Sequence, residues 1–464
     1  MELPVSFKDS MQRLLGSEYE QFIATYDNKA VSALRVNTSK ITLSEFEDTA
    51  PYYIEKIPFI SNGYYINDTD AWSKHPYYYA GLYYLQEASA MLPAEMFSYG
   101  ADDIVLDLCA APGGKSTQIS ISGIGLLLSN DISFSRTIPL VKNLDLFGMA
   151  NHSVMCEDPE KLCTIYPETF DKILVDAPCS GEGMFRKDPG LITSYELKGP
   201  EAYRDIQKSL LECAYKMLKK DGTLLYSTCT FSDIEDEQVI LSFLEHHKDM
   251  TVCDIAKHDG LCGPYDRYSG NDAIAGCVHA FPHRFRGEGH FLALMKKHGG
   301  NCADAHSVDL NKSTFTSFPQ QAEEFASFFS EGLAQHILKR QFISTKDGLI
   351  FMLPDGFAGL YRGNIRYVRT GTCFGSLNRS GKFTAHTAFA LTLKADDFTN
   401  VLDLRADDPC VIKYLKGETL TGTDTLYDLK KGYVLVCVDH HPLGFANYDG
   451  KKLKNFYEKG WIYK

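Results

Sequence analysis

The central part of the chain alternates short apolar runs with amphipathic stretches, and the pattern changes on either side of it. Between residues 76 and 297, apolar runs such as DIVLDL, GLLLSND and KILVDAP are separated by segments with helical spacing. Strands that alternate with helices are typical of βαβ units on a parallel sheet. We therefore predict an α/β, Rossmann-like domain over residues 76–297.

The flanking regions show other patterns. Residues 1–75 combine a helical start with the β-like stretch SALRVNTSK and two tyrosine-rich segments, which predicts an α+β extension. Residues 298–318 are polar with little periodicity and indicate a linker. In residues 319–395, QQAEEFASFFSEGLAQHIL predicts one amphipathic helix, and GLIFMLP and IRYVRTG predict strands. Residues 396–464 end with GYVLVCVD and HPLGFANYDG, which are typical of a small barrel or sandwich.

Composition narrows the class of protein and its compartment. The 464 residues are 44% hydrophobic and 23% charged, which is ordinary for a soluble globular protein. No apolar run reaches the roughly 18 residues of a membrane-spanning helix, and the N-terminus lacks the apolar stretch of a signal peptide. The 13 cysteines show no C-x-x-C spacing. We therefore expect a cytoplasmic protein with reduced thiols and no metal site.

The net charge of -13 disfavours a protein that coats nucleic acid through bulk charge, but it allows a local basic surface. One candidate lies between Lys430 and Lys464, where seven lysines outnumber three acids and alternate with aromatic residues. Lysines can meet phosphates while aromatic rings stack on exposed bases. The alternative is a β domain whose aromatic residues form the core and whose lysines are solvated. Composition alone favours this alternative.

The first apolar run of the central region leads into a loop suited to a nucleotide-like ligand. Asp107 to Cys109 end the strand, Pro112, Gly113 and Gly114 form the loop, and a helix follows. Small residues allow a close approach of the ligand, and a helix N-terminus favours acidic or polar groups. A phosphate-binding Walker loop needs glycine where Cys109 stands, and the loop lacks the G-x-G-x-x-G fingerprint of dinucleotide sites. S-adenosylmethionine, which has no phosphates, therefore remains as the candidate ligand of this loop.

Acids at the ends of the next two strands support this ligand. Asp131 ends GLLLSND and would hold the ribose hydroxyls, while Asp158 ends the following strand and would bond the adenine amino group. Each acid alone is more typical of a loop or a helix cap. Their order at successive strand ends is the stronger signal.

Two later strands each end on a cysteine, in ILVDAPCSGEG and LLYSTCTFS. A thiol suggests covalent catalysis, because thiolate addition to carbon 6 of cytosine makes carbon 5 reactive enough to take a methyl group. Asp176 is placed to assist at nitrogen 3, provided that it is protonated or shares a proton with the base. Either Cys179 or Cys229 could attack. Cys229 precedes a predicted helix start with a capping box of Ser232 and Glu235, a location that lowers the pKa of a thiol.

The segments LDLCAAPGGKST, ILVDAPCSGEGMFRKDP and LLYSTCTFSDIEDEQV resemble, in this order, the RNA 5-methylcytosine methyltransferases of the Sun/NOP type, particularly the bacterial RsmF branch. ALRVNTSK and YYLQEASAMLPAEM resemble segments that precede the catalytic domain of that family. Together these matches span roughly residues 30–297 and are highly specific. The end of the chain resembles the PUA-like domain of the RsmF branch, which favours RNA contact there.

The resemblance implies roles for individual residues. The family's nucleophile falls on Cys229, its second cysteine, which assists product release, falls on Cys179, and its strand-end acid falls on Asp176. The stretch CEDPEKL departs from the family's Asp-Gly pattern, so the choice between Glu157 and Asp158 stays open. The implied S-adenosyl-L-methionine contacts are Cys109, Ala110, Ala111, Pro112, Gly113, Gly114, Lys115, Asp131, Asp158 and Asp176.

The predicted function is methylation of carbon 5 of cytosine in RNA, with 16S rRNA as the expected substrate, by a cytoplasmic monomer. The N-terminal and PUA-like regions would bind RNA, and Arg186 and Lys187 would face its phosphates. Methylation of tRNA is the alternative within the class. An RNA-binding assembly factor without activity ranks below the methyltransferase, because such a protein would not need the cofactor acids and both cysteines. A P-loop NTPase comes last.

Overall fold

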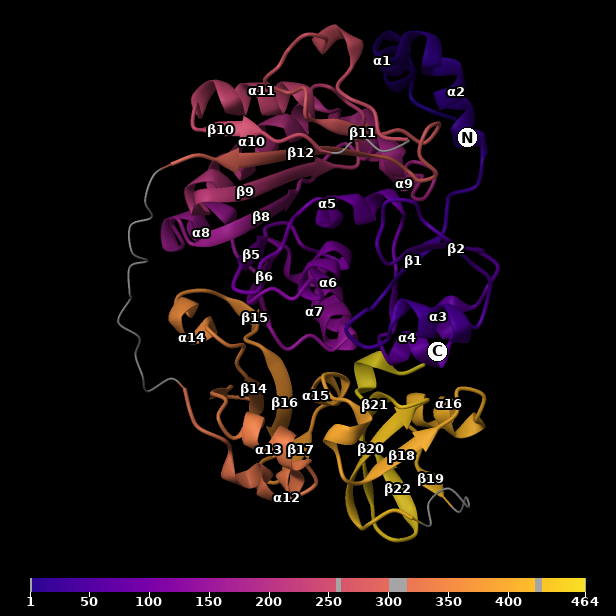
Figure 1. Ribbon diagram of the computed structural model, residues 1–464, viewed down its shortest axis with the longest axis vertical. Coiled ribbons are helices and arrows are strands. Elements are labelled where there is room, and N and C mark those ends of the chain that lie inside the picture. Colours follow the sequence, from indigo (N-terminus) through magenta and orange to yellow (C-terminus); the bar gives the residue numbers. More distant parts are fainter. Residues whose placement is uncertain (1, 256–259, 300–314, 422–427, 464) are drawn as a thin grey trace.

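A nine-stranded sheet forms the centre of the molecule (Figure 1). The computed structural model describes residues 2–255, 260–299, 315–421 and 428–463, so most of the predicted linker lies outside the described residues. The strand order is β10-β12-β9-β8-β5-β6-β7-β15, with β11 paired to β12. Neighbours from β7 to β9 are parallel, and β12 is antiparallel to β9, which confirms the Rossmann-like prediction. The strands are β5 (Ile104–Asp107), β6 (Leu126–Asn130), β7 (His152–Met155), β8 (Phe170–Asp176), β9 (Leu218–Thr228), β10 (Met250–Val252), β11 (Val278–Ala280), β12 (His290–Lys297) and β15 (Tyr367–Arg369).

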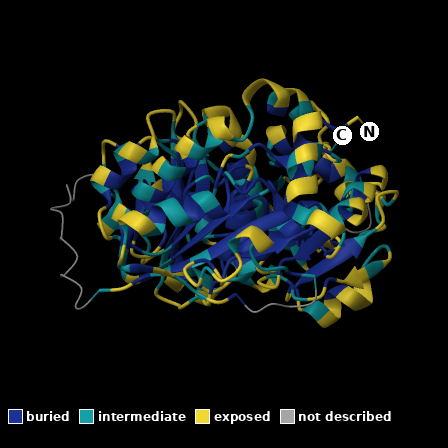
Figure 2. Cartoon of the chain, turned by 90° about the horizontal axis from the view of Figure 1, so that it is seen from above, coloured by how far each residue is buried: buried dark blue, intermediate teal, exposed yellow. Residues whose placement is uncertain are grey.

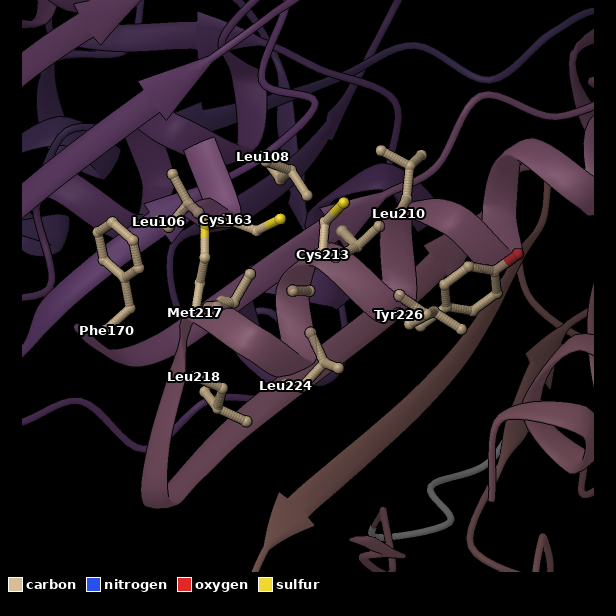
Figure 3. Close-up of a cluster of buried hydrophobic side chains, with 14 of the residues drawn as sticks. Leu106, Leu108, Cys163, Phe170, Leu210, Cys213, Met217, Leu218, Leu224 and Tyr226 are labelled. Atoms are coloured by element: carbon tan, nitrogen blue, oxygen red, sulfur yellow. The ribbon is translucent and has the colours of Figure 1, made fainter. Parts of the chain in front are cut away.

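Helices cover both faces of this sheet because successive strand residues point to opposite sides. Val105 of β5 belongs to the apolar cluster under α6 and α7, whereas its neighbour Leu106 belongs to the cluster under α8 and α10. Figure 3 shows the second cluster, in which Leu210, Cys213 and Met217 of α10 recur at helical spacing and are buried. The helices are α5 (Leu92–Glu95), α6 (Gly114–Ser120), α7 (Phe134–Phe147), α8 (Pro159–Ile165), α9 (Gly190–Lys198), α10 (Glu201–Met217) and α11 (Glu237–His246).

The N-terminal extension packs on the central domain through aromatic rings. Phe7 and Phe22 meet Phe185 and Phe231 edge-on, with ring centroids 5.4 Å and 5.2 Å apart. A four-stranded sheet follows in the order β2-β3-β1-β4, and β4 comes from residues beyond 75. The elements are α1 (Val5–Leu15), α2 (Tyr19–Ala24), β1 (Ala33–Val36), α3 (Leu43–Thr49), β2 (Ile54–Lys56), β3 (Gly63–Ile66), α4 (Pro76–Tyr79) and β4 (Tyr83–Leu85).

The middle region differs from its prediction. The expected single helix is wrong: α12 (Glu323–Ala326) ends before Ser330, whose side chain caps α13 (Glu331–Ile337). With the helix broken here, Phe325 and Phe329 both lie in one aromatic core cluster. Strand β15 leaves this region and extends the central sheet beside β7. The remaining elements are β13 (Phe342–Ser344), β14 (Leu349–Met352), α14 (Phe357–Leu360), β16 (Thr372–Leu377), β17 (Phe383–Ala385) and α15 (Thr387–Leu391).

The C-terminal domain is a five-stranded sheet in the order β18-β20-β21-β22-β19. Its core continues into the N-terminal extension, because Trp72 and Tyr77 share an apolar cluster with Val436 and Trp461. Figure 1 shows the C-terminus beside α3 and α4. The elements are β18 (Val401–Leu404), α16 (Pro409–Leu415), β19 (Leu420–Thr421), β20 (Gly432–Val438), β21 (His441–Tyr448) and β22 (Lys452–Asn455).

Burial follows this arrangement, with buried strands inside and exposed residues on the outer helices and loops (Figure 2). Within the described ranges, no helix has the length and apolar character needed to cross a lipid bilayer. Some buried residues are polar, among them Asp107, Asp131 and Ser227 at the strand ends. Buried charges are costly unless they are paired or bonded. This edge of the sheet is therefore the candidate site.

Candidate active site

The loop after β5 brings its backbone very close to neighbouring side chains. It contains a cis peptide bond at Ala111-Pro112. Gly113 has a φ of 106°, and a Cβ there would lie 2.9 Å from Leu140 Cδ1. A Cβ on Gly114, the first residue of α6, would lie 3.0 Å from Gln86 Nε2. The positive φ favours glycine at position 113, and a side chain at position 114 would require the end of Gln86 to shift.

Two buried carboxyl groups border this loop. One oxygen of Asp107 accepts from Ser116 Oγ at 2.6 Å, while the other has no partner among the described residues. Burial raises the pKa of Asp107 to about 7. Asp131 accepts from the Ala111 N–H at 3.3 Å and lies 3.4 Å from Arg136. An unpaired buried acceptor beside a glycine loop and a helix N-terminus fits a polar, nucleoside-type ligand. From the sequence, Asp107 was predicted only as a strand end.

Glu157 and Asp158 follow β7 and have different partners. The Glu157 carboxylate accepts from Lys161 Nζ at 2.6 Å and from the Arg366 N–H at 2.8 Å. Asp158 is exposed and caps α8 by accepting from the Glu160 N–H at 2.9 Å. A cofactor role for Asp158 stays a prediction.

Asp176 ends β8 and forms an ion pair with the lysine of the cofactor loop. Its Oδ2 lies 2.7 Å from Lys115 Nζ, and its Oδ1 accepts from Ser227 Oγ at 2.8 Å. Burial, the largest single effect, favours the neutral acid, but the charge of Lys115 and the hydrogen bonds from Lys115 and Ser227 act together to lower the pKa of Asp176. Burial also opposes a charged Lys115, but the charge of Asp176 and the hydrogen bond to it raise the pKa of Lys115. Asp176 is therefore ionised. Of the two conditions predicted for its role, a protonated Asp176 is ruled out, and a proton shared with the base remains as the hypothesis.

A buried chain of polar groups behind Asp176 was not predicted. His290 Nε2 lies 3.9 Å from Asp176 Oδ1, and His290 Nδ1 lies 3.2 Å from Ser89 Oγ. Ser89 Oγ in turn donates to Glu87 at 2.5 Å. Burial lowers the pKa of His290 to about 4, so the ring is neutral near pH 7. A signal was available, since these three polar residues interrupt apolar segments, where a buried polar group is the informative exception.

Cys179 and Cys229 meet across the ends of β8 and β9. These strands are parallel neighbours, with Asp176 opposite Ser227. The two Sγ atoms are 3.4 Å apart, and both thiols are free and half-buried. The hydrogen bond to Cys229, together with burial, raises the pKa of Cys179 well above its ordinary range. Cys179 therefore keeps its proton near neutral pH and can donate it toward the Cys229 sulfur.

The helix after Cys229 begins later than predicted. α11 starts at Glu237 and has no side-chain cap. The predicted capping box of Ser232 and Glu235 is wrong, because Glu235 turns to the neighbouring loop and binds Ser180 there. The N-terminus of α11 therefore does not lie directly after Cys229 in the chain, as the capping box had implied.

Arg186 was predicted to face RNA phosphates, but its side chain lies inside the protein. Its side chain is 6% exposed and pairs with the fully buried Glu288 at 2.8 Å. It also donates to the carbonyls of Thr25 and Gly287. Arg186 thus ties the N-terminal extension to the central domain. Its neighbour Lys187 is exposed, and contact of Lys187 with RNA stays a prediction.

The aromatic residues of the C-terminal domain divide into core and surface. Four are core residues with exposures of 7% or less: Tyr433, Phe445, Tyr457 and Trp461. Phe456 is half-buried, with Lys454 Nζ 5.9 Å from its ring centroid. The exposed lysines of the domain's described C-terminal stretch are Lys430, Lys431, Lys451, Lys452, Lys454 and Lys459. Most of the rings therefore stabilise the fold, and the lysines carry the surface charge.

A Rossmann-like sheet with a glycine loop, carboxyl groups at successive strand ends and no phosphate-binding fingerprint defines an S-adenosylmethionine-dependent methyltransferase. Family comparisons agree. Residues 95–296 match the 16S rRNA methyltransferase RsmB/F, residues 3–88 match the N-terminal domain of 16S rRNA methyltransferase RsmF, and residues 401–463 match the methyltransferase RsmF PUA domain.

Individual relatives cover nearly the whole chain. Ribosomal RNA small subunit methyltransferase F of Erwinia tasmaniensis is 30% identical over 473 residues, which cover 98% of this chain and 96% of that protein. The protein of the same name from Vibrio cholerae is 29% identical over 472 residues, with the same coverage. The chain therefore belongs to the RsmF family of Sun/NOP-type methyltransferases, and its cofactor is S-adenosyl-L-methionine.

Solved structures show the same fold. NSun6 from Pyrococcus horikoshii with SFG is 21% identical, has a TM-score of 0.55, and is matched over 64% of this chain and 98% of that chain. A methyltransferase homolog protein from Pyrococcus horikoshii is 24% identical, has a TM-score of 0.54, and is matched over 62% of this chain and 93% of that chain. The predicted fold class and cofactor are thus confirmed.

Proposed function

We propose that this protein methylates carbon 5 of cytosine in ribosomal RNA through a covalent adduct with Cys229. The observation that carries the proposal is the pair of thiols 3.4 Å apart, beside the ion pair of Asp176 and Lys115. Methylation of a nitrogen or a ribose oxygen needs no thiol nucleophile, whereas carbon 5 of cytosine must first be activated. The thiol pair therefore favours carbon 5.

S-adenosyl-L-methionine supplies an electrophilic methyl group when it is bound. The loop from Cys109 to Lys115 would hold it. Asp131 would accept from the ribose hydroxyls, and the unpaired oxygen of Asp107 is a further acceptor in reach of the loop. Asp158 is proposed on the adenine side.

Cys229 is the attacking thiol in this proposal. Cys179 keeps its proton and can donate it toward the Cys229 sulfur, which lies 3.4 Å away. The attacking species in this proposal is the Cys229 thiolate, because the thiolate is the nucleophilic form of a thiol. Its lone pair forms the S–C6 bond while the electron pair of the C5=C6 double bond moves to carbon 5, which then takes up the methyl group.

Release of the product requires loss of the hydrogen on carbon 5. The C5–H electron pair restores the C5=C6 double bond, and Cys229 leaves with the electron pair of the S–C6 bond. Cys179 is proposed to assist. Once Cys229 is bonded to carbon 6, the hydrogen bond that raises the pKa of Cys179 no longer forms. Cys179, which is only half-buried, can then lose its own proton to solvent water and, as a thiolate, accept the proton from carbon 5.

Asp176 acts as a carboxylate in this scheme. It would accept a hydrogen bond from the exocyclic amino group of cytosine and from a proton held at nitrogen 3. The contact with the amino group orients the base, and the contact at nitrogen 3 would keep that nitrogen protonated, so that its proton neutralises the negative charge that builds on the ring as the thiolate adds. Lys115 and Ser227, at 2.7 Å and 2.8 Å, hold the carboxylate in place for this task.

The substrate we propose is 16S rRNA, because the matching family descriptions and relatives carry that name or that of the small ribosomal subunit. The PUA-type C-terminal domain supports RNA binding. We propose that the protein acts as a monomer in the cytoplasm. Transfer RNA is the alternative substrate.

The test uses the purified protein with methyl-labelled S-adenosylmethionine and three substrates in parallel: 16S rRNA, small ribosomal subunits and total tRNA. The product is digested to nucleosides and separated. We expect label in 5-methylcytidine from one of the two ribosomal substrates. Label in any other nucleoside would refute the proposed chemistry, and label in tRNA alone would replace the substrate.

A further inference from the structure

The loop that carries Cys179 is held by a carboxyl group from the loop that carries Cys229. Glu235 Oε1 accepts from the Ser180 backbone N–H at 2.9 Å, and Oε2 accepts from Ser180 Oγ. Ser180 directly follows Cys179. Gln207 Nε2 donates both to Glu235 Oε1 and to the carbonyl of Pro178, each at 3.0 Å. Residues on both sides of the Cys179 thiol are thus tied to one glutamate.

The reverse contacts are also present. Glu182, from the Cys179 loop, accepts from the Phe231 N–H at 2.9 Å. Gly183 N–H donates to the carbonyl of Cys229 itself, also at 2.9 Å. Between the two loops, Ser180 Oγ lies 2.7 Å from the hydroxyl of Thr230, the residue after Cys229. Each thiol therefore has a neighbour in sequence that is bonded to the other loop.

These groups are shielded from water. Glu182, Glu235, Ser180 and Thr230 are all 3% exposed or less. Burial, reinforced by the charge of Glu235, raises the pKa of Glu182 to about 8, and burial raises the pKa of Glu235 to about 7. At least one of the two carboxyl groups thus keeps a proton near pH 7, so the pair does not bury two like charges.

We propose that Glu235, through Ser180 and Thr230, is a positioning residue that sets the distance between the two catalytic thiols. This inference rests on the proposed function, in which Cys229 and Cys179 act in turn on one cytosine. Attack requires only Cys229 to be in place. Release requires Cys179 to reach the same base while Cys229 is bonded to it. Loosening the contact between the loops should therefore slow release more than attack.

A purely structural role would give a different result. Removal of a buried acceptor would then lower stability and reduce attack and release by the same factor. The distinguishing quantity is the partition of enzyme-bound RNA between covalent adduct and released 5-methylcytidine RNA in a single turnover. Misplacement of a catalytic group by about 1 Å costs on the order of a hundredfold in rate. We therefore expect the rate of the release step to fall by a factor of up to this size.

The experiment compares Glu235→Ala with Glu235→Gln in the full chain. Glutamine keeps an acceptor for the Ser180 N–H and Gln207, and its amide group can donate to Ser180 Oγ. Alanine removes all of these contacts. We expect Glu235→Ala to accumulate adduct and to slow release by roughly tenfold to a hundredfold, with S-adenosylmethionine affinity unchanged. Glu235→Gln should stay within a few-fold of the wild type.

Thr230→Val is the second variant, because it deletes only the hydroxyl link and conserves volume. It carries the test if Glu235→Ala does not fold, and its adduct fraction should rise in the same direction. A wild-type partition in the folded variants would overturn the inference, as would an equal slowing of attack and release. A wild-type enzyme that forms neither adduct nor 5-methylcytidine would instead refute the proposed function on which the inference rests.

Discussion

The strand ends of the central sheet and the C-terminal β domain both offered candidate functional residues, but they differ in what places those residues. At the strand ends, Asp176 and the two thiols come together because parallel neighbours end at one edge of the sheet. In the C-terminal domain, Tyr433 and Phe445 lie in the core. Alternation along a strand sorts side chains into inside and outside. The strand ends thus brought candidate catalytic groups together, whereas these aromatic residues form a core, as composition alone had favoured.

The largest expected effect belongs to the thiols. Cys229→Ala should abolish methyl transfer and leave no covalent link to RNA, because carbon 6 then has no nucleophile. Cys179→Ala should retain attack and accumulate a protein-RNA species that survives denaturing electrophoresis. The double variant should show no such species. Adduct trapped by Cys229→Ala and absent in Cys179→Ala would show that the two roles are reversed.

Much of the fold was predictable because it follows from patterns of burial. The alternating apolar runs predicted the parallel sheet, and GYVLVCVD and HPLGFANYDG predicted β20 and β21. The helix prediction in the middle region failed, because helical periodicity cannot show that Phe325 and Phe329 belong to one aromatic cluster that breaks the helix. The pairing of β15 with β7 was also missed, since contacts between distant segments leave no local pattern.

The site was predictable to the extent that strand ends define it. The structure brings Asp131 beside Ala111 of the loop, and Lys115 beside Asp176. What the sequence could not give was the partner of each polar group. Glu235 fits a capping box in sequence, yet a partner from another loop competes for its carboxyl group. Arg186 in an apparently solvated loop is recruited by a buried carboxylate.

The next largest effect concerns stability and separates Arg186 from its neighbour. Arg186→Ala leaves Glu288 buried without its charged partner, and breaking a buried pair costs about 3 to 5 kcal/mol. The free energy of unfolding, measured by denaturant titration, should fall by that amount. Lys187→Ala is the matched control, because an exposed substitution changes stability by about 0.5 kcal/mol or less. Equal stability of the two variants would contradict the buried ion pair.

A smaller effect is expected at the cofactor loop. Asp131→Ala removes a charged acceptor proposed for the ribose hydroxyls, and a hydrogen bond to a charged group contributes roughly 1.5 to 3 kcal/mol. Affinity for S-adenosylmethionine in a calorimetric titration should therefore fall by about tenfold to a hundredfold. Asp158→Asn is an informative companion, because asparagine caps a helix as well as aspartate does. If the Asp158→Asn variant binds S-adenosylmethionine more weakly, the loss therefore comes from the cofactor site and not from the helix.

The smallest effect is expected in the C-terminal domain, where the lysines and not the core rings should bind RNA. Deleting residues 396–464 cannot test this, because Trp461 belongs to the core shared with Trp72 of the N-terminal extension. Substitution of exposed lysines by alanine leaves that core intact. The set to change together is Lys430, Lys431, Lys451, Lys452 and Lys454.

Each lysine that no longer neutralises a phosphate of single-stranded RNA should lower the slope of log affinity against log salt by about 0.7, because fewer counterions are released. The five-lysine variant should therefore bind RNA more weakly and with a smaller salt slope, while its affinity for S-adenosylmethionine and its thermal stability stay unchanged. Alanine at Lys339 and Lys346, exposed lysines of the middle region, is the control for removal of surface charge. If the two variants have the same salt slope, the C-terminal lysines are only solvated surface charge. The strand ends of the central sheet and the C-terminal domain would then differ in function as well as in packing.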